Sequence, residues 1–147
     1  MSQTVRLHRV FAATPERLYR AFTDPEAFAK WLPPFGFTAR VHAMDVRVGG
    51  EWRMHFTNFS TGHRHAFGGR YLVLAPGERV SYTSAFDDPH LPGEMTTSVS
   101  LRAVSVGTEI QVVQEGIPDV IPQEACYLGW QESLKQLQQL VEPQIPD

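Results

Sequence analysis

Two different spacings of hydrophobic residues divide the chain, and each predicts its own kind of secondary structure. In residues 4–13, Val5, Leu7 and Phe11 alternate with polar neighbours, which predicts a β-strand with one buried face. From about residue 35 to residue 116 the signal is again β, broken by turn-forming segments such as the Pro-Gly pair within 75–78. We therefore expect about six further strands joined by short turns, at 37–46, 51–59, 66–74, 79–86, 94–104 and 107–115.

Two short helices are predicted between the first strand and this β region. Each begins with a side chain that can accept a hydrogen bond from the helix N-terminus, followed by proline: Thr14 before Pro15, and Asp24 before Pro25. Both helices carry apolar faces, and consecutive prolines at 33–34 end the second one.

A long helix is predicted over residues 122–142. Cys126, Trp130, Leu134, Leu137 and Val141 recur at steps of three or four residues and form one apolar stripe. A sheet with one buried face needs such a cover. The pattern therefore predicts an α+β fold, in which six to seven antiparallel strands curve around the C-terminal helix, and a single domain over 1–147.

The segment 44–56 combines a turn with an unusually bulky strand face. Gly49 and Gly50 predict a turn that needs special backbone angles, and Asp45 and Arg47 can pair to brace it. The strand that follows places three large, adaptable side chains on one face: Trp52, Met54 and Phe56. These residues raise the question of what that face contacts.

Composition limits the class of protein. A chain of 147 residues is long enough to bury roughly 68–70% of its unfolded surface, so it needs no disulfide or metal to fold. The only cysteine, Cys126, excludes an intrachain disulfide and fits a reducing compartment. Neither a signal peptide nor a membrane span is apparent, and a net charge of −3 with scattered basic residues argues against nucleic-acid binding. We expect a cytoplasmic protein.

Several segments resemble a known family. They are "AATPERLYRAFTDPEAFAKWLPP" at 12–34, "DVRVGGEW" at 45–52, "YLVLAPGERVSYT" at 71–83 and "GWQESLKQL" at 129–137. In content and order they are similar to the heat-shock protein 90 ATPase activator homologue family, of the START-like (SRPBCC, Bet v-type) superfamily. The chain departs from the family at Cys126, where many members carry histidine, so a role that needs that imidazole does not carry over.

The resemblance implies a helix-grip fold with an apolar cavity between the curved sheet and the C-terminal helix. It implies no single reaction, because the superfamily includes lipid carriers, hormone receptors, cyclases and oxygenase subunits. The family name also suggests a chaperone as a partner.

The apolar faces supply candidate walls for such a cavity. Aromatic and methionine side chains with a few polar groups are typical of apolar ligand pockets, although the same side chains can also form a filled core. A single helix about 10 Å across does not fill the concavity of a broad sheet, which favours a cavity. The predicted wall residues are Trp31, Phe35, Trp52, Met54, Phe56, Tyr71, Tyr82, Met95 and Trp130, with Phe67 and Tyr127 on similar faces.

Three polar residues at inward positions are candidate handles for a ligand: Arg9, Asn58 and Gln114. A buried Arg9 would need a carboxylate or an anionic ligand; the alternative is that the strand turns it outward or an acidic neighbour satisfies it. Gly129 lies inside the predicted C-terminal helix, where it costs roughly 0.8–1.0 kcal/mol relative to alanine. Either close packing of the helix on the sheet or an opening beside it would explain this glycine, and we favour close packing.

No residue set predicts a metal, a cofactor or a catalytic centre. His63 and His65 have the spacing of paired metal ligands, but they fall in a predicted loop at 60–65 without a third ligand. The other histidines are expected to be solvated, and Cys126 is expected to be an inert, buried thiol. These other histidines are His8, His42, His55 and His90.

Three functions are consistent with the sequence. The first is binding of a small apolar molecule in the cavity, with no assigned reaction. The second is an enzyme of the cyclase, aromatase or hydrolase type, which gains weight if Arg9, Asn58 and Gln114 converge on one point. The third is a module that acts on a chaperone through its surface. A homodimer is possible in each case.

Overall fold

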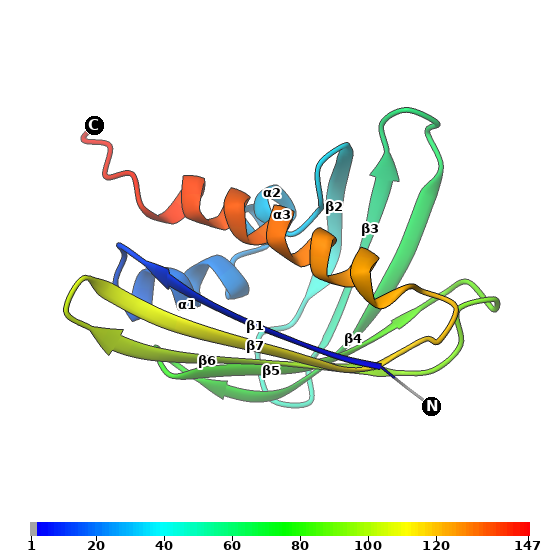
Figure 1. Ribbon diagram of the computed structural model, residues 1–147, viewed down its shortest axis with the longest axis horizontal. Helices are drawn as coiled ribbons and strands as arrows, with labels where there is room; N and C mark the ends of the chain where they lie inside the picture. The colour runs from blue at the N-terminus through cyan, green and yellow to red at the C-terminus, as the bar shows by residue number, and fades with distance from the viewer. Residues whose placement is uncertain (1–2) are drawn as a thin grey trace.

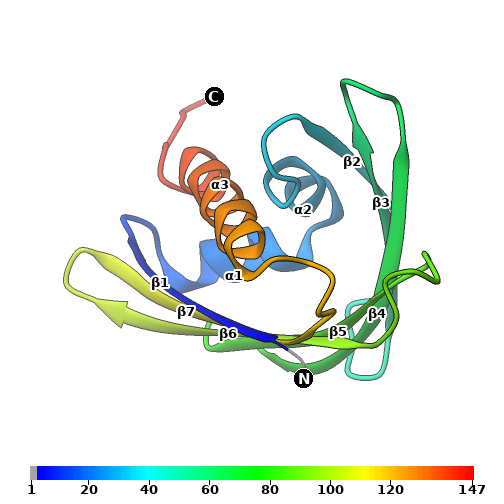
Figure 2. The same cartoon turned by 45° about the vertical axis from the view of Figure 1, so that its right-hand side comes forward.

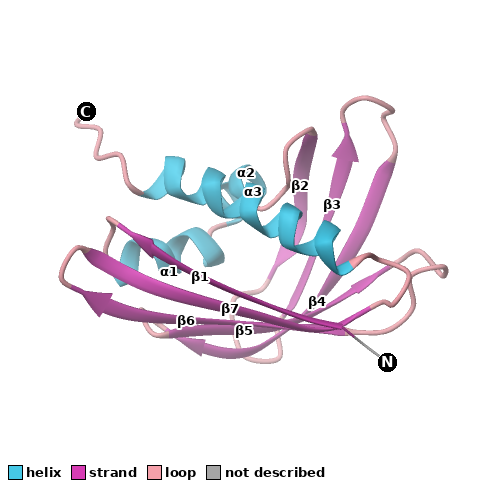
Figure 3. Cartoon of the chain, in the orientation of Figure 1, coloured by secondary structure: helices cyan, strands magenta, loops and turns pink. Residues whose placement is uncertain are grey.

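Residues 3–147, which the computed structural model describes, form a seven-stranded antiparallel sheet with three helices on its concave side (Figure 1 and Figure 3). The elements are β1 (Gln3–Phe11), α1 (Pro15–Thr23), α2 (Pro25–Trp31), β2 (Phe37–Met44), β3 (Glu51–Asn58), β4 (Arg64–Ala75), β5 (Arg79–Phe86), β6 (Met95–Val104), β7 (Gly107–Ile117) and α3 (Gln123–Val141). The strands lie in the order β1-β7-β6-β5-β4-β3-β2, so the first strand pairs with the last. The expected α+β helix-grip fold is confirmed.

The helix boundaries follow from the capping residues. Thr14 accepts a hydrogen bond from the backbone N–H of Arg17 at 3.2 Å, and Asp24 accepts from Glu26 at 2.9 Å. A proline follows each cap, at the position where a missing N–H costs nothing. The predicted starts of both short helices are therefore confirmed. None of the helices in the described residues is long and apolar enough to cross a membrane.

The sheet bends so strongly that β2, β3 and β4 rise as a wall beside a floor of β1, β7, β6 and β5 (Figure 2). Two glycines in β4 allow its neighbouring strands to approach closely. A Cβ atom on Gly69 would lie 2.0 Å from the carbonyl oxygen of Thr83, and one on Gly68 would lie 2.3 Å from that of Trp52. Only glycine permits such close approach of the strands. The indole N–H of Trp52 reaches the same Thr83 carbonyl at 3.1 Å.

The turn before β3 is built as the sequence predicts. Gly49 has a φ of +82°, a conformation that other residues rarely adopt. The guanidinium of Arg47 donates to the carboxylate of Asp45 at 2.7 Å, which confirms the expected brace. The predicted loop at 60–65 is too long, because β4 already begins at Arg64, where it pairs with Thr57 of β3.

One end of the concave face is filled by the short helices. Trp31 is completely buried. Its ring packs against the rings of Phe22 and Phe28 in T-shaped arrangements, at centroid distances of 4.8 and 5.5 Å. Its indole N–H donates to the carbonyl of Ala21 at 2.8 Å. This cluster packs α1 and α2 together, while α3 crosses the remaining part of the concave face (Figure 1).

Candidate functional site

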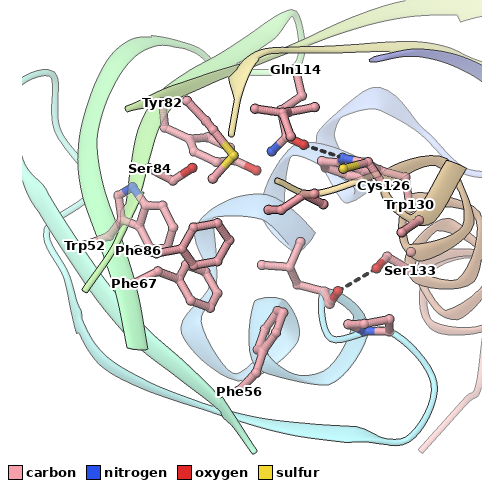
Figure 4. Close-up of a pocket in the computed structure, with 17 residues that line it drawn as sticks. Trp52, Phe56, Phe67, Tyr82, Ser84, Phe86, Gln114, Cys126, Trp130 and Ser133 are labelled. Atoms are coloured by element: carbon pink, nitrogen blue, oxygen red, sulfur yellow. Dashed lines mark hydrogen bonds between the residues drawn. The ribbon is translucent and has the colours of Figure 1, made fainter. Parts of the chain in front are cut away.

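A cavity of about 280 Å³ lies between the wall strands, the floor strands and the first half of α3 (Figure 4). Six aromatic residues supply much of its surface: Trp52, Phe56, Phe67, Tyr82, Phe86 and Trp130. Seven further residues add apolar or backbone surface: Leu32, Pro34, Met95, Ile117, Ile121, Ala125 and Gly129. Among these, Ala125 is exposed and Pro34 is half-buried, so the lining extends to the protein surface at the start of α3 and in the loop after α2.

The remaining lining residues are polar but uncharged: Ser84, Gln114, Cys126 and Ser133. No aspartate, glutamate, lysine, arginine or histidine belongs to the lining in the described part of the chain. A charged ligand would therefore lose its hydration without gaining an ion pair, which is strongly unfavourable. The electrostatics of the cavity suit a neutral molecule.

Half of the site residues predicted from sequence line this cavity. They are Trp52, Phe56, Tyr82, Met95, Trp130 and Gln114. They come from five different elements, β3, β5, β6, β7 and α3, which the fold brings together at the bend of the sheet. The aromatic wall is held by its own contacts, because the ring of Phe67 meets the rings of Phe56 and Trp52 nearly perpendicularly at 4.8 and 5.7 Å.

Three predicted wall residues belong to the core beside the cavity instead. Trp31, Met54 and Tyr71 are buried, with exposed fractions of 0%, 1% and 3%, but none of them lines the cavity. Burial raises the pKa of the Tyr71 hydroxyl to about 12, so this residue stays protonated and neutral. Strand alternation for Met54 and Tyr71, and the apolar helix face for Trp31, correctly placed these side chains inside, but neither pattern distinguished packed positions from open ones.

Three other predicted site residues lie away from the cavity. Phe35 is half exposed in the loop after α2. Arg9 keeps the register of Leu7 and Phe11 and lies near α3, but it is exposed on this edge strand, outside the cavity lining, and donates to the carbonyl oxygen of His8 at 2.8 Å. It is therefore not buried, and no bulge turns it outward. Asn58 uses its side-chain oxygen to accept from the N–H of Ser60 at 2.9 Å, within the turn that follows β3. Arg9, Asn58 and Gln114 therefore do not converge on one point.

Several lining residues were not predicted from the sequence. Ser84 and Phe86 continue the face of Tyr82 along β5, and the period-two pattern could have identified them. Cys126, Gly129 and Ser133 line the cavity from α3 at helical spacing with Trp130, but the sequence analysis did not name them as wall residues. Tyr127 accepts a hydrogen bond from the N–H of Arg6 instead of lining the cavity.

The expectation that α3 packs closely on the sheet at Gly129 is wrong. A Cβ atom built on this residue would have nothing within 4 Å beyond its own helix. Gly129 itself lines the cavity, so the opening beside the helix, which was the other explanation, holds. The absent side chain enlarges the space available to a ligand.

Gln114 is fixed by two hydrogen bonds at the boundary between sheet and helix. Its amide oxygen accepts from the indole N–H of Trp130 at 3.1 Å, a bond visible in Figure 4. Its amide nitrogen donates to the hydroxyl of Thr97 at 3.1 Å. The two bonds join α3 to β7 and β6, and they use part of the hydrogen-bonding capacity that the sequence reading assigned to a ligand.

The titratable groups of the lining are neutral at physiological pH. Burial raises the pKa of the Tyr82 hydroxyl far above its ordinary value, and it also raises the pKa of the Cys126 thiol. Protonated Tyr82 can donate a hydrogen bond, whereas the protonated Cys126 is a poor nucleophile. The cavity is thus suited to recognition by shape and by hydrogen bonds.

A pair of histidines lies on the opposite, convex face of the sheet. His42 and His55 are hydrogen-bonded, with 2.6 Å between Nε2 and Nδ1, and their rings are stacked at 4.8 Å. The expectation that His55 is solvated is wrong, since only 7% of it is exposed. Within residues 3–147 no group of three or more histidine, cysteine, aspartate or glutamate side chains could hold a metal ion.

Comparison with known proteins agrees with the fold. A sequence model of the family described as Activator of Hsp90 ATPase homolog 1-like protein matches residues 12–142. The crystal structure of a protein from Chromobacterium violaceum is similar to this chain at 61% sequence identity and a TM-score of 0.95, over 96% of this chain and 98% of that one. A search of the curated proteins found no match.

More distant structures share the fold alone. A protein from Rhodobacter sphaeroides is 24% identical with a TM-score of 0.82, over 95% of this chain and 97% of that one. A protein from Nitrosomonas europaea is 23% identical with a TM-score of 0.79, over 93% of this chain and 92% of that one.

Proposed function

The chain belongs to the Activator of Hsp90 ATPase homolog 1-like family, and on that premise we propose that it binds a small, uncharged, hydrophobic molecule between its sheet and α3. The observation that carries the proposal is the cavity of about 280 Å³ with its uncharged, largely aromatic lining. Ligand sites are typically concave and mostly apolar, with a few placed polar groups. The free thiol of Cys126 is compatible with the reducing cytoplasm, where we expect the protein to act.

The size of the cavity limits the size of the ligand. An apolar cavity of about 150 Å³ accommodates benzene. The present cavity is almost twice as large, so a molecule of about two fused rings, or an aliphatic chain of similar bulk, would fill it. The edge-to-face packing of Trp52, Phe67 and Phe56 suits contact with another planar ring.

Binding can be tested directly on the purified protein. Native mass spectrometry should detect a co-purified small molecule, and the uncharged fluorophore phenylnaphthylamine should increase its emission on mixing with the protein. Gly129→Leu, which places a side chain into the open space, should reduce that emission. Gln139→Leu, which adds the same side chain to an exposed position of α3, is the matched control. A protein that neither retains a molecule nor binds the fluorophore would refute the proposal.

The family description favours a second candidate function, stimulation of a chaperone ATPase. Such an activity would use the surface of the protein and would not need the cavity. Measuring the ATPase rate of an Hsp90-type chaperone with the wild-type protein and with Gly129→Leu separates the two candidates. Stimulation that is equal for both proteins would indicate a surface function, and absence of stimulation would leave the cavity as the functional site.

An enzyme that uses the same cavity is less well supported. The convergence that would favour catalysis does not occur, because Arg9 and Asn58 lie outside the lining and Gln114 alone reaches it. The described lining offers no carboxylate or imidazole as a general base near neutral pH.

A further inference from the structure

A row of polar side chains crosses the floor of the cavity from β5 to α3. Tyr82 of β5, Thr97 of β6 and Gln114 of β7 are direct neighbours in the sheet register, and Trp130 of α3 closes the row. Gln114 accepts from Trp130 and donates to Thr97, each at 3.1 Å. These three residues form one continuous chain of hydrogen bonds, which ends at the residue that pairs with Tyr82.

The chemistry of the groups fixes the direction of this chain. An indole N–H can only donate, so the Gln114 oxygen must face Trp130 and its NH₂ group must face Thr97. The Thr97 oxygen then accepts from Gln114, and its own hydrogen is free to be donated onward. Both donors of the chain therefore point from the helix toward β6, the strand next to Tyr82, and the orientation of Gln114 is set within the protein.

Beside the end of this chain, Tyr82 contributes a hydroxyl group to the cavity lining. The residue is only 5% exposed, and its phenolic O–H has a hydrogen that a ligand in the cavity could accept. The ring is held by edge contacts to Trp52 and Phe28 at centroid distances of 5.5 and 6.3 Å, so the hydroxyl cannot turn away easily. Tyr82 and Gln114 lie side by side at the same end of the cavity (Figure 4).

We propose that the Tyr82 hydroxyl is the hydrogen-bond donor that recognises the ligand, which is therefore a neutral apolar molecule with a carbonyl or ether oxygen. This inference rests on the proposed ligand-binding function and specifies its chemistry. Burial keeps the Tyr82 hydroxyl protonated by raising its pKa, so this group can donate a hydrogen bond to the ligand. A carboxylate is disfavoured, because no cation in the described lining would compensate its charge.

The test compares two probes of the same shape. Naphthyl methyl ketone carries the acceptor oxygen, and isopropenylnaphthalene replaces that oxygen with a CH₂ group. Calorimetric titration should show that Tyr82→Phe weakens binding of the ketone by about fivefold to tenfold, which corresponds to the free energy of one hydrogen bond. The affinity for the hydrocarbon should not change. Tyr71→Phe removes a buried hydroxyl opposite Tyr82 in the sheet but outside the cavity, so it should affect neither probe.

A measurement on the wild-type protein keeps the test independent of any folding defect. The infrared stretching band of the ketone carbonyl should shift to lower frequency on binding, relative to the same ketone in hexane. An unshifted band, or equal effects of Tyr82→Phe on both probes, would overturn the role of Tyr82 and leave the ligand-binding function intact. Failure of both probes to bind the wild-type protein would overturn the ligand-binding function, and this inference with it.

Discussion

Replacing Gly129 with alanine adds one methyl group to the inner side of α3, at a position where the structure defines the surroundings. No atom outside the helix lies within 4 Å of the added carbon, so the methyl group neither clashes nor gains packing. The effect on stability is then the difference in helix propensity alone, about 0.8–1.0 kcal/mol in favour of alanine. Since the entropy of unfolding of a 147-residue chain is roughly 0.3 kcal/mol per kelvin, the Tm should rise by about 3 °C.

The assay is thermal or urea unfolding followed by circular dichroism, with wild-type protein and Gln139→Ala as a control at an exposed position of the same helix. Gly129→Leu extends the test, because its larger side chain would occupy part of the cavity and should weaken binding of phenylnaphthylamine. A lower Tm for Gly129→Ala would mean that α3 packs tightly at this residue, and unchanged binding by Gly129→Leu would mean that the space beside it is not the binding site. Either result would refute the reasoning.

Three further effects follow from the structure. Trp31→Ala should lower the free energy of unfolding by about 3–5 kcal/mol in urea titrations, because it empties a fully buried site; a loss below about 1 kcal/mol would contradict its core role. His55 has a lowered pKa because of burial first, then the positive charges of Arg64, His42 and Arg40. The unfolded chain therefore binds a proton at His55 more readily than the folded protein does. As a result, the free energy of unfolding should be highest above about pH 6.5 and should decrease as the pH falls below that value. Urea midpoints between neutral and mildly acidic pH should show this decline, and His55→Gln should flatten it; an equal slope in the variant would exclude His55 as its cause. Burial raises the pKa of Cys126, so alkylation by iodoacetamide should be slow near neutral pH and accelerate as the pH rises. Bound phenylnaphthylamine should slow it further, and a rate independent of the probe would argue against occupancy beside this thiol.

Local rules predicted most of the secondary structure because the deciding interactions are local. The hydrogen bonds of Thr14 and Asp24 to their own helices, and the φ of Gly49, depend on neighbours only a few residues away. The early start of β4 has a different cause. Arg64 and His65 pair with β3 through their backbones in a hairpin beyond the helices, where no apolar face is needed to mark a strand.

The candidate site was predictable only in part, because periodicity gives the face of a residue and not its depth. Trp52 and Met54 share one face of β3, yet Trp52 borders the cavity and Met54 is packed in the core. Which of the two occurs depends on where α1, α2 and α3 cross the sheet, and that is set by contacts between distant segments. Gln114 illustrates the same point, since its orientation follows from hydrogen bonds to Thr97 of β6 and Trp130 of α3.

The cavity itself is the strongest reason to expect a ligand. At about 24 cal/mol per Å³, an empty closed space of 280 Å³ would cost roughly 7 kcal/mol, a large part of the usual stability of a protein. Access to solvent lowers that cost but leaves aromatic surface in contact with water. A residue with a side chain at position 129 would have reduced the space, since a Cβ atom there meets nothing within 4 Å. Keeping glycine there weakens the helix and enlarges the cavity, and a bound apolar molecule would offset both losses by covering Trp52, Phe67 and their neighbours.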